Sequence, residues 1–250
     1  LVRPDDGRVV VVRFEEIPDQ APLTEDATVQ SPSDVSFETR MADLAADLDV
    51  DLTADEVVSH DTKHAVVNFA DDHEVDAILA EHEPLRLRSR LLGDPVDWIV
   101  RHAPCDVLLV DNLGYDAPER IALSGDGGPY ASLTVNVAEA IAASNDGSIS
   151  LWHPADGDST DQQRRTIGDY QSDLSELLSV PVRAQSVRTD GGQLPRPDLL
   201  VRRGADHRLR SGLFDDRPVL LSPGCTTVTV YPRESGRPGL ARKLLERLMF

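Results

Sequence analysis

The decisive stretch of this sequence is Gly93-Asp-Pro-Val-Asp-Trp-Ile-Val-Arg-His-Ala-Pro-Cys-Asp-Val-Leu-Leu-Val110. Asp94 followed by Pro95 is a typical helix start, because aspartate caps the first N–H groups and proline fits the first helical position. We therefore predict a helix over Pro95–His102 and, after the break at Pro104, a strand over 107–110. A helix that leads into an apolar strand is typical of a βαβ unit and hence of a parallel sheet.

Parts of this region, and of the segment just before it, are repeated about 120 residues later in the chain. Arg86-Leu-Arg-Ser-Arg-Leu-Leu-Gly-Asp94 matches Arg208-Leu-Arg-Ser-Gly-Leu-Phe-Asp-Asp216, Asp76-Ala-Ile-Leu matches Asp198-Leu-Leu-Val, and Cys105-Asp-Val-Leu-Leu-Val matches Cys225-Thr-Thr-Val-Thr-Val. A period of this length indicates a duplicated domain, because the units of solenoid proteins are only about 20 to 50 residues long.

The hydrophobic periodicity predicts an α/β domain over 1–113, a second over 118–232, and an amphipathic helix in 239–250. Further strands of the first copy are predicted at 8–14, 55–59 and 77–80, and further helices at 34–46 and 62–71. The second copy has predicted strands at 120–123, 148–152, 182–187, 198–201 and 226–231, and helices at 131–143 and 161–178. No strand of the first copy matches 120–123, so we expect the natural protein to continue upstream of Leu1.

The formal net charge is −19, and Lys63 and Lys243 are the only lysines. Such a surface repels nucleic acid and anionic lipid, so neither is an expected partner. The lysine-poor, acidic composition fits a halophilic cytoplasm, where salt screens the self-repulsion, although an ordinary acidic protein remains an alternative. Cys105 and Cys225 adjoin apolar runs and are predicted to be buried free thiols of a reducing compartment. The Tyr130, Trp98 and Trp152 side chains are expected in the core or at an interface.

Asp76-Ala-Ile-Leu together with 93–110 resembles the last third of a universal stress protein domain. Ala122-Leu-Ser-Gly-Asp-Gly-Gly-Pro-Tyr-Ala-Ser-Leu133 is similar to the first strand of that family and its following loop. Val9-Val-Val-Val-Arg-Phe-Glu-Glu-Ile-Pro-Asp-Gln-Ala-Pro-Leu23 resembles the stress-protein domains fused behind prokaryotic amino-acid permeases. The resemblance implies two Rossmann-like, adenine-nucleotide alpha-hydrolase-like domains with parallel sheets of strand order 3-2-1-4-5. It also implies that the two fifth strands pair, which makes an intramolecular pseudo-dimer.

Nucleotide-binding members of the family carry a loop G-x2-G-x9-G-[ST] after the fourth strand, where backbone N–H groups and a helix N-terminus hold the phosphates. In the first copy Glu81 and Pro84 replace the two leading glycines, and Asp94 follows Gly93, which argues against ATP there. In the second copy Gly204 remains, with Arg202 and Arg203 beside it. The candidate ligand-binding residues are Gly125, Asp126, Gly127, Gly128, Gly204, Arg208, Arg210 and Gly212. Either they bind ATP, AMP or another small anion, or the arginines pair with surface carboxylates.

The sequence contains no Gly-x-Ser-x-Gly elbow, Walker loop or Cys-His pair at usable spacing, so no enzyme is expected. His60 and His64 have the spacing of metal ligands on a helix, but Asp61-Thr62 looks like a helix start, so we expect a solvated cluster and no metal site. The prediction is a non-catalytic cytoplasmic regulatory module of an amino-acid (APC-type) transporter, fused upstream at the inner face of the membrane. The alternative is a free-standing tandem protein that binds a nucleotide or other anion in its second domain. Homodimer formation is left open.

Overall fold

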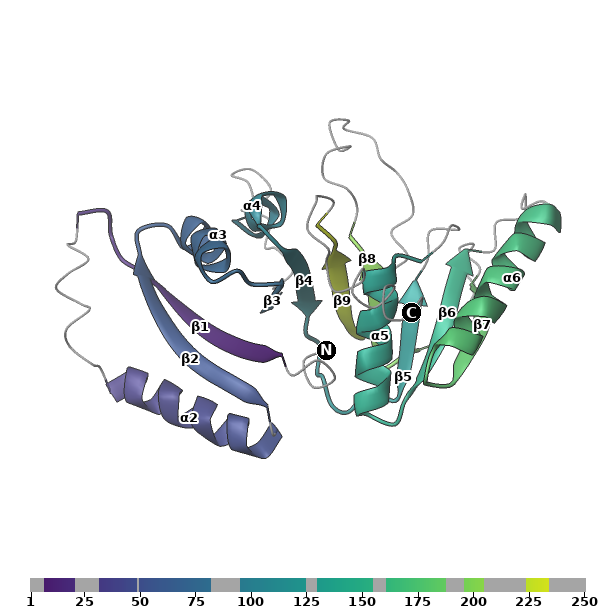
Figure 1. The fold of residues 1–250 in the computed structure, drawn as a ribbon, viewed down its shortest axis with the longest axis horizontal. Coiled ribbons are helices and arrows are strands. Elements are labelled where there is room, and N and C mark those ends of the chain that lie inside the picture. The colour runs from purple at the N-terminus through teal and green to yellow at the C-terminus, as the bar shows by residue number, and fades with distance from the viewer. Residues whose placement is uncertain are drawn as a thin grey trace. The chain divides into compact units, whose positions relative to one another are not determined.

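The computed structural model describes residues 7–20, 32–48, 50–81, 95–124, 130–154, 161–187, 196–204 and 224–233. The chain splits into two compact units, one of Leu1–Glu74 with Asp94–Ala103 and one of Val75–Gly93 with Pro104–Phe250. Each unit has its own sheet (Figure 1). In the part of the chain that the structure describes, no helix is both long and apolar enough to cross a membrane.

The first unit is built around a two-stranded parallel sheet. β1 (Arg8–Glu16) pairs with β2 (Asp51–Ser59) along its whole length. α2 (Pro32–Leu48) connects the two strands and packs on β2, since parallel neighbours need a crossover. α3 (Thr62–Asp72) packs on β1 and on α4 (Pro95–His102).

β2 is longer than the predicted strand 55–59, because it begins at Asp51. Acidic and small residues at its start disfavour a strand on local propensity. The structure pairs Leu52 with Val9 and Thr53 with Val10, so the partner strand overrides that propensity. Arg13 and Glu56 also lie opposite each other, and the Arg13 Nε donates to the Glu56 Oε1 at 2.9 Å.

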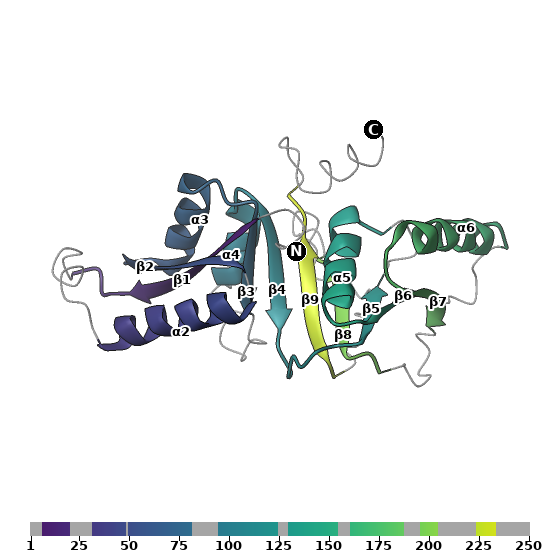
Figure 2. The ribbon, with the colours of Figure 1, turned by 60° about the horizontal axis from the view of Figure 1, so that its bottom comes forward.

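The second unit contains a seven-stranded sheet in the order β3-β4-β9-β8-β5-β6-β7. Its strands are β3 (Ala77–Glu81), β4 (Asp106–Asp111), β5 (Arg120–Ser124), β6 (Ser148–Pro154), β7 (Val182–Val187), β8 (Leu199–Arg203) and β9 (Thr226–Tyr231). All neighbours are parallel except β4 and β9, which are antiparallel and lie side by side in Figure 2. α5 (Ser132–Ser144) contacts β5, β6 and β8, and α6 (Asp161–Leu177) contacts β7.

The main core of the second unit lies between the sheet and α5. Alternate residues of the central strands, such as Leu123, Leu151 and Val201, are completely buried there. They meet the apolar face of α5, which contributes Leu133 and Val137. This alternation explains why the short strands of the second copy were predictable from sequence.

The strand order predicted for each domain, 3-2-1-4-5, is confirmed in the second copy, where β5 to β9 follow it. Pairing of the two final strands is also confirmed, with Leu109 opposite Thr229. The finer prediction of a tandem pseudo-dimer remains a proposal, because the first copy does not form one sheet among the described residues. Its strands β1 and β2 belong to the first unit, whereas β3 and β4 join the sheet of the second.

The compact units therefore do not coincide with the predicted domains 1–113 and 118–232, which stay a prediction about the duplicated segments. Residues 112–118, predicted to link the two copies, contain no helix or strand. The amphipathic helix predicted in 239–250 and the N-cap Asp94 lie outside the described residues. Cys105 is buried as predicted, whereas Cys225 is only half-buried, and neither is in a disulfide.

Candidate functional site

Four side chains form a row across the carboxyl ends of the central strands in the second unit. The register places Ser124 of β5 between Trp152 of β6 and Arg202 of β8, and it places Arg202 beside Thr229 of β9. Residues in register on parallel strands project from the same face, and neighbouring strands are about 4.8 Å apart. These four residues are the polar row.

The polar row lies on the face of the sheet opposite α5. Ala122 and Leu200, two residues before Ser124 and Arg202, share this face and pack with Trp152 in a small separate cluster. The strand order reverses between β5 and β8, because the chain runs outward from β5 to β7 and then returns to β8. Open parallel sheets bind ligands outside the carboxyl ends of the strands at such a reversal.

Trp152 supplies an unused hydrogen-bond donor to this row. Trp152 is only 2% exposed, and its indole N–H has no hydrogen-bond partner among the described residues. Among the described residues, the Thr134 hydroxyl of α5 is the other buried side-chain atom of this kind. Leaving a buried donor unpaired costs roughly 1–3 kcal/mol, so an acceptor atom placed there would recover part of that free energy.

Arg202 is half-buried and oriented by its neighbour. Its Nε donates to the Thr229 Oγ1 at 3.1 Å. The guanidinium, the Ser124 hydroxyl and the Trp152 indole N–H are all hydrogen-bond donors, and a guanidinium in particular suits carboxylate or phosphate oxygens. Arg203, the neighbouring arginine, projects from the opposite face because successive strand residues alternate.

Two tyrosines fix the backbone next to the polar row. The Tyr130 hydroxyl donates to the Trp152 carbonyl at 3.0 Å, and the Tyr170 hydroxyl donates to the Tyr130 carbonyl at 3.3 Å. The two rings stack with their centroids 6.0 Å apart. Burial raises the pKa of Tyr130 to about 12, although a hydrogen bond with Gln171 opposes this. Tyr130 is therefore protonated at neutral pH and serves as a structural donor.

Of the ligand-binding residues predicted from sequence, the structure describes only Gly204. Its N–H donates to the Val230 carbonyl at 2.8 Å, so that N–H is used by the sheet. A Cβ on Gly204 would lie 2.1 Å from the Tyr231 Cε1, which gives the glycine a packing reason of its own. The remaining predicted residues, Gly125, Asp126, Gly127, Gly128, Arg208, Arg210 and Gly212, lie outside the described residues.

Sequence reasoning did not single out Ser124 or Thr229, and it assigned Trp152 to the core or an interface. The assignment of Trp152 and Tyr130 to the core is confirmed by their burial. The only sequence signal for the polar row is that each member lies near the end of an apolar strand. The four come into line only when the strand order and register are known.

In the first copy, Glu81 ends β3 and is exposed, which matches the expected loss of a glycine there. Pro84, Gly93 and Asp94 lie outside the described residues. Of these loop positions the structure therefore describes only Glu81, whose carboxylate would repel a phosphate at this edge of the sheet.

The histidines of the first unit are engaged in other contacts. Asp61 caps α3, as predicted, and its carboxylate accepts from the His64 N–H at 3.3 Å. The His64 Nδ1 lies 2.9 Å from the Asp61 Oδ2, and the His64 ring meets Trp98 at a centroid distance of 4.3 Å. His60 Nδ1 lies 3.3 Å from the Ile17 carbonyl. No metal-binding group of side chains is found among the described residues.

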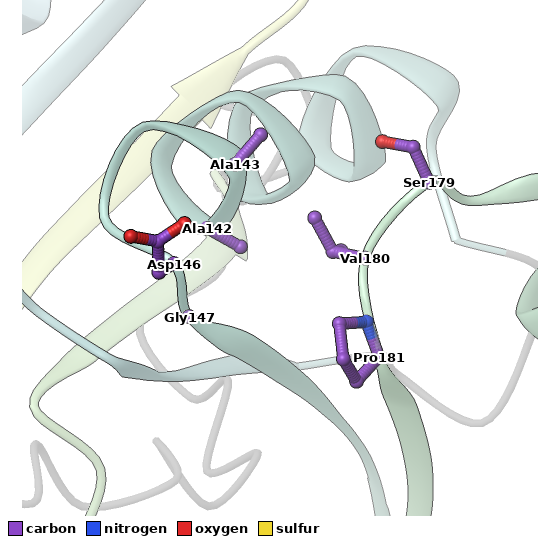
Figure 3. Close-up of a pocket in the computed structure, with 7 residues that line it drawn as sticks. All are labelled: Ala142, Ala143, Asp146, Gly147, Ser179, Val180 and Pro181. Carbon is purple, nitrogen blue, oxygen red and sulfur yellow. The ribbon is translucent and has the colours of Figure 1, made fainter.

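A shallow depression of about 320 Å³ lies at the opposite end of the strands, near the starts of β6 and β7 (Figure 3). It is lined by Ala142, Ala143, Asp146, Gly147, Ser179, Val180 and Pro181. The Ser179 N–H and hydroxyl both donate to the Glu139 Oε1, at 2.7 and 2.8 Å, so these two polar groups of Ser179 are already paired. The depression thus offers a ligand less than the polar row does.

The comparisons with known proteins agree with this fold. A structure of the cytoplasmic domain of a prokaryotic cation chloride cotransporter covers 90% of this chain and 85% of its own, at 16% identity and a TM-score of 0.60. A Pseudomonas aeruginosa protein described as a universal stress protein covers 99% and 88%, at 15% identity and a TM-score of 0.54. A second protein from that species, of unknown function, covers 99% and 88% at 13% identity and a TM-score of 0.51.

No curated protein matches the chain in sequence. Because the identities to the solved structures are low, these likenesses establish the fold alone. It is an α/β fold with parallel-rich sheets of the universal stress protein kind. A sequence match to a family model is more specific. The model of the universal stress protein family matches residues 1–111. The universal stress protein family is therefore the family that residues 1–111 resemble in sequence.

Proposed function

We propose that the chain is a non-catalytic regulatory module of a membrane transporter, located at the cytoplasmic face of the membrane. The observation that carries the proposal is the fold match to the cytoplasmic domain of a cation chloride cotransporter, which extends over 90% of the chain. A match of that extent includes both duplicated segments. The resemblance of 9–23 to domains fused behind amino-acid permeases makes amino acids the proposed solute.

The described residues support a binding role more than catalysis. The polar row holds donors but no paired base and nucleophile, and the tyrosine next to it is protonated at neutral pH. A regulatory module acts by binding one state of its partner more tightly than another. Such a module needs a binding surface and does not need a catalytic group.

Deleting the coding region of this chain from its gene in the source organism tests the proposal. We expect the apparent affinity for at least one labelled amino acid to change by roughly fivefold or more, the lower range of allosteric coupling. Transporter abundance in the membrane, measured by immunoblot, should stay unchanged. A change in rubidium or chloride uptake alone would keep the transporter proposal and replace the solute. Unchanged uptake of every solute would overturn it.

A second candidate function is a free-standing sensor that binds a nucleotide or other small anion in the second copy. The unpartnered indole N–H of Trp152, in register with Ser124 and Arg202, favours this candidate. Calorimetry with ATP, ADP, AMP and cyclic dinucleotides at molar KCl tests it. We expect Trp152→Phe and Arg202→Gln to weaken binding, whereas Arg183→Gln on the exposed surface of β7 should not. If no heat of binding were detected for any of these ligands, this candidate function would be excluded.

A further inference from the structure

The indole of Trp98 lies against two imidazole rings in the first unit. Its ring centroid is 4.3 Å from that of His64 in α3 and 4.1 Å from that of His102, one turn later in α4. The Trp98 and His102 rings are stacked, with an angle of 17° between their planes. α3 and α4 belong to the same compact unit and pack on each other (Figure 1). The contact between these helices therefore includes an ionisable ring from each of them.

Each imidazole is held by an oxygen atom that can only accept a hydrogen bond. The His64 Nδ1 lies 2.9 Å from the Asp61 Oδ2, and the His102 Nδ1 lies 2.7 Å from the Trp98 carbonyl oxygen. Both Nδ1 atoms therefore carry a hydrogen, which they donate. The proton that each ring gains or loses in solution is then the one on Nε2.

The surroundings of both rings favour the charged imidazolium. A cation is attracted to the face of an indole, and Trp98 offers that face to His64 and His102. The Asp61 carboxylate adds an ion pair to His64. His102 is the last residue of α4, where the helix end carries a partial negative charge. Histidine ordinarily changes its charge between about pH 5 and 8, so the contact should be stronger at the acidic end of this range and weaken as the pH rises.

The permanent charges around these rings are mostly negative. Lys63 opposes a charge on His64, because its Nζ lies 6.0 Å from the centroid of the same indole, but it also lies 3.1 Å from the Asp61 Oδ2. β1 adds a carboxylate, since the Glu16 Oε2 accepts from the Thr62 hydroxyl at 2.9 Å. The remaining groups are Asp55 of β2, which the register places on the same face of the sheet as Glu16, Asp71 and Asp72 at the end of α3, and Asp97 and Arg101 of α4. This balance of charge favours the charged imidazoles.

We propose that the α3–α4 contact is a pH-sensitive element of the first unit, which tightens when His64 and His102 become charged against the Trp98 indole. As the pH rises and the imidazoles lose their charge, α4 separates from α3 more often. The first unit is suited to such control because its described core is small, with Ile17 and Ala70 as the buried apolar residues, so one contact weighs heavily. This element is independent of the polar row and does not require the regulatory role proposed above.

Hydrogen exchange of the 250-residue chain at molar KCl tests the proposal. Rates are corrected for the intrinsic effect of pH and expressed as protection factors. We expect the amides of α3 and α4 to be protected at least about threefold more at pH 5.5 than at pH 7.5, a modest factor because both imidazoles are exposed. His64→Gln and His102→Gln should each reduce this difference, and the double variant should abolish it. His60→Gln is the matched control, because the His60 Nδ1 faces the Ile17 carbonyl and its ring contacts no aromatic ring among the described residues.

The fluorescence of Trp98 reports the charge on the two rings independently. The chain has two tryptophans, so Trp98 is the only one in a Trp152→Phe background. A charged imidazole in contact with an indole quenches its fluorescence, so the emission should fall on acidification and should not do so in the double variant. If the double variant does not fold, the two single variants decide the same question.

Four results would overturn the proposal. The first is equal protection of α3 and α4 at both pH values, and the second is lower protection at pH 5.5, which would mean that repulsion from Lys63 outweighs the attraction. The third is a difference in protection that persists without His64 and His102. The fourth is quenching of Trp98 without a gain in protection, because the rings would then become charged without tightening the contact.

Discussion

Strands β1 and β6 are equivalent in the duplicated chain, yet they are packed very differently. Both follow Asp-Gly and both are rich in apolar residues. Ile149 and Leu151 of β6 are fully buried, with β5 and β7 on either side and α5 above them. Val9 and Val11 of β1 are only half-buried, and β1 pairs with β2 alone among the described strands. An apolar strand is therefore buried by its neighbours and not by its composition.

The same difference extends to the two units. Ile17 and Ala70 are the buried apolar residues of the first unit in the described part of the chain, whereas the second has a large continuous core. A continuous run of valines such as Val9–Val12 is typical of a strand covered on both faces. A sheet of only two strands is marginally stable in water. We therefore expect the first unit to be the less stable of the two.

Native-state hydrogen exchange should show the largest contrast. Amides of β1 and β2 are expected to exchange at least about a hundredfold faster than those of β5 and β6, because opening the first unit exposes little apolar surface. Exchange followed by mass spectrometry at molar KCl measures this. Equal protection of both sheets would show that the first unit is as stable as the second.

Matched leucine substitutions should sharpen the comparison. Leu151→Ala in β6 is expected to lower the free energy of unfolding by about 2–5 kcal/mol, the usual cost of a large cavity in a core. Leu52→Ala in β2 should cost less than half as much, because Leu52 is only half-buried. Urea unfolding followed by circular dichroism provides both values. Similar costs at the two sites would contradict the difference in packing.

Gly204→Ala should destabilise the second unit by about 1–3 kcal/mol, since the new Cβ would force the Tyr231 ring to move. Adding Tyr231→Ala should remove most of the extra cost of Gly204→Ala. Gly168→Ala is the control, because no atom lies near the added methyl group and alanine favours a helix. Thermal unfolding of the wild type, the three single variants and the double variant measures these costs. A neutral Gly204→Ala would leave ligand binding as the better reason for this glycine.

The smallest effect is expected at the start of α3. Desolvation raises the pKa of Asp61, but hydrogen bonds from Lys63 and His64 outweigh it and lower the pKa to about 2. The ordinary pKa of aspartate is about 3.9, so its stabilising contribution is complete above pH 4 and disappears as the pH falls through 2. Asp61→Asn keeps the cap but should lose this pH dependence. Thermal unfolding from pH 5 to pH 2 distinguishes the two proteins, and parallel curves would refute the assignment.

Much of the candidate site could not be predicted, for a specific physical reason. The glycine loops were identifiable because their chemistry resides in a short continuous segment. The polar row joins Ser124, Trp152, Arg202 and Thr229, which come from four strands and depend on a register that no local pattern encodes. Gly204 was identified as a residue of interest, but its contact with Tyr231 is visible only once β8 and β9 are paired.

The sequence by itself determined the duplication, the alternation of strands and helices, and the acidic surface. These properties are local or one-dimensional, so they are readable from periodicity, caps and counts. Only the tertiary structure decided that β3 and β4 join the sheet of the second copy, while β1 and β2 form a sheet of their own. Strand pairing links residues far apart in the chain, and the neighbour that a strand finds decides whether its apolar side chains are buried or left open.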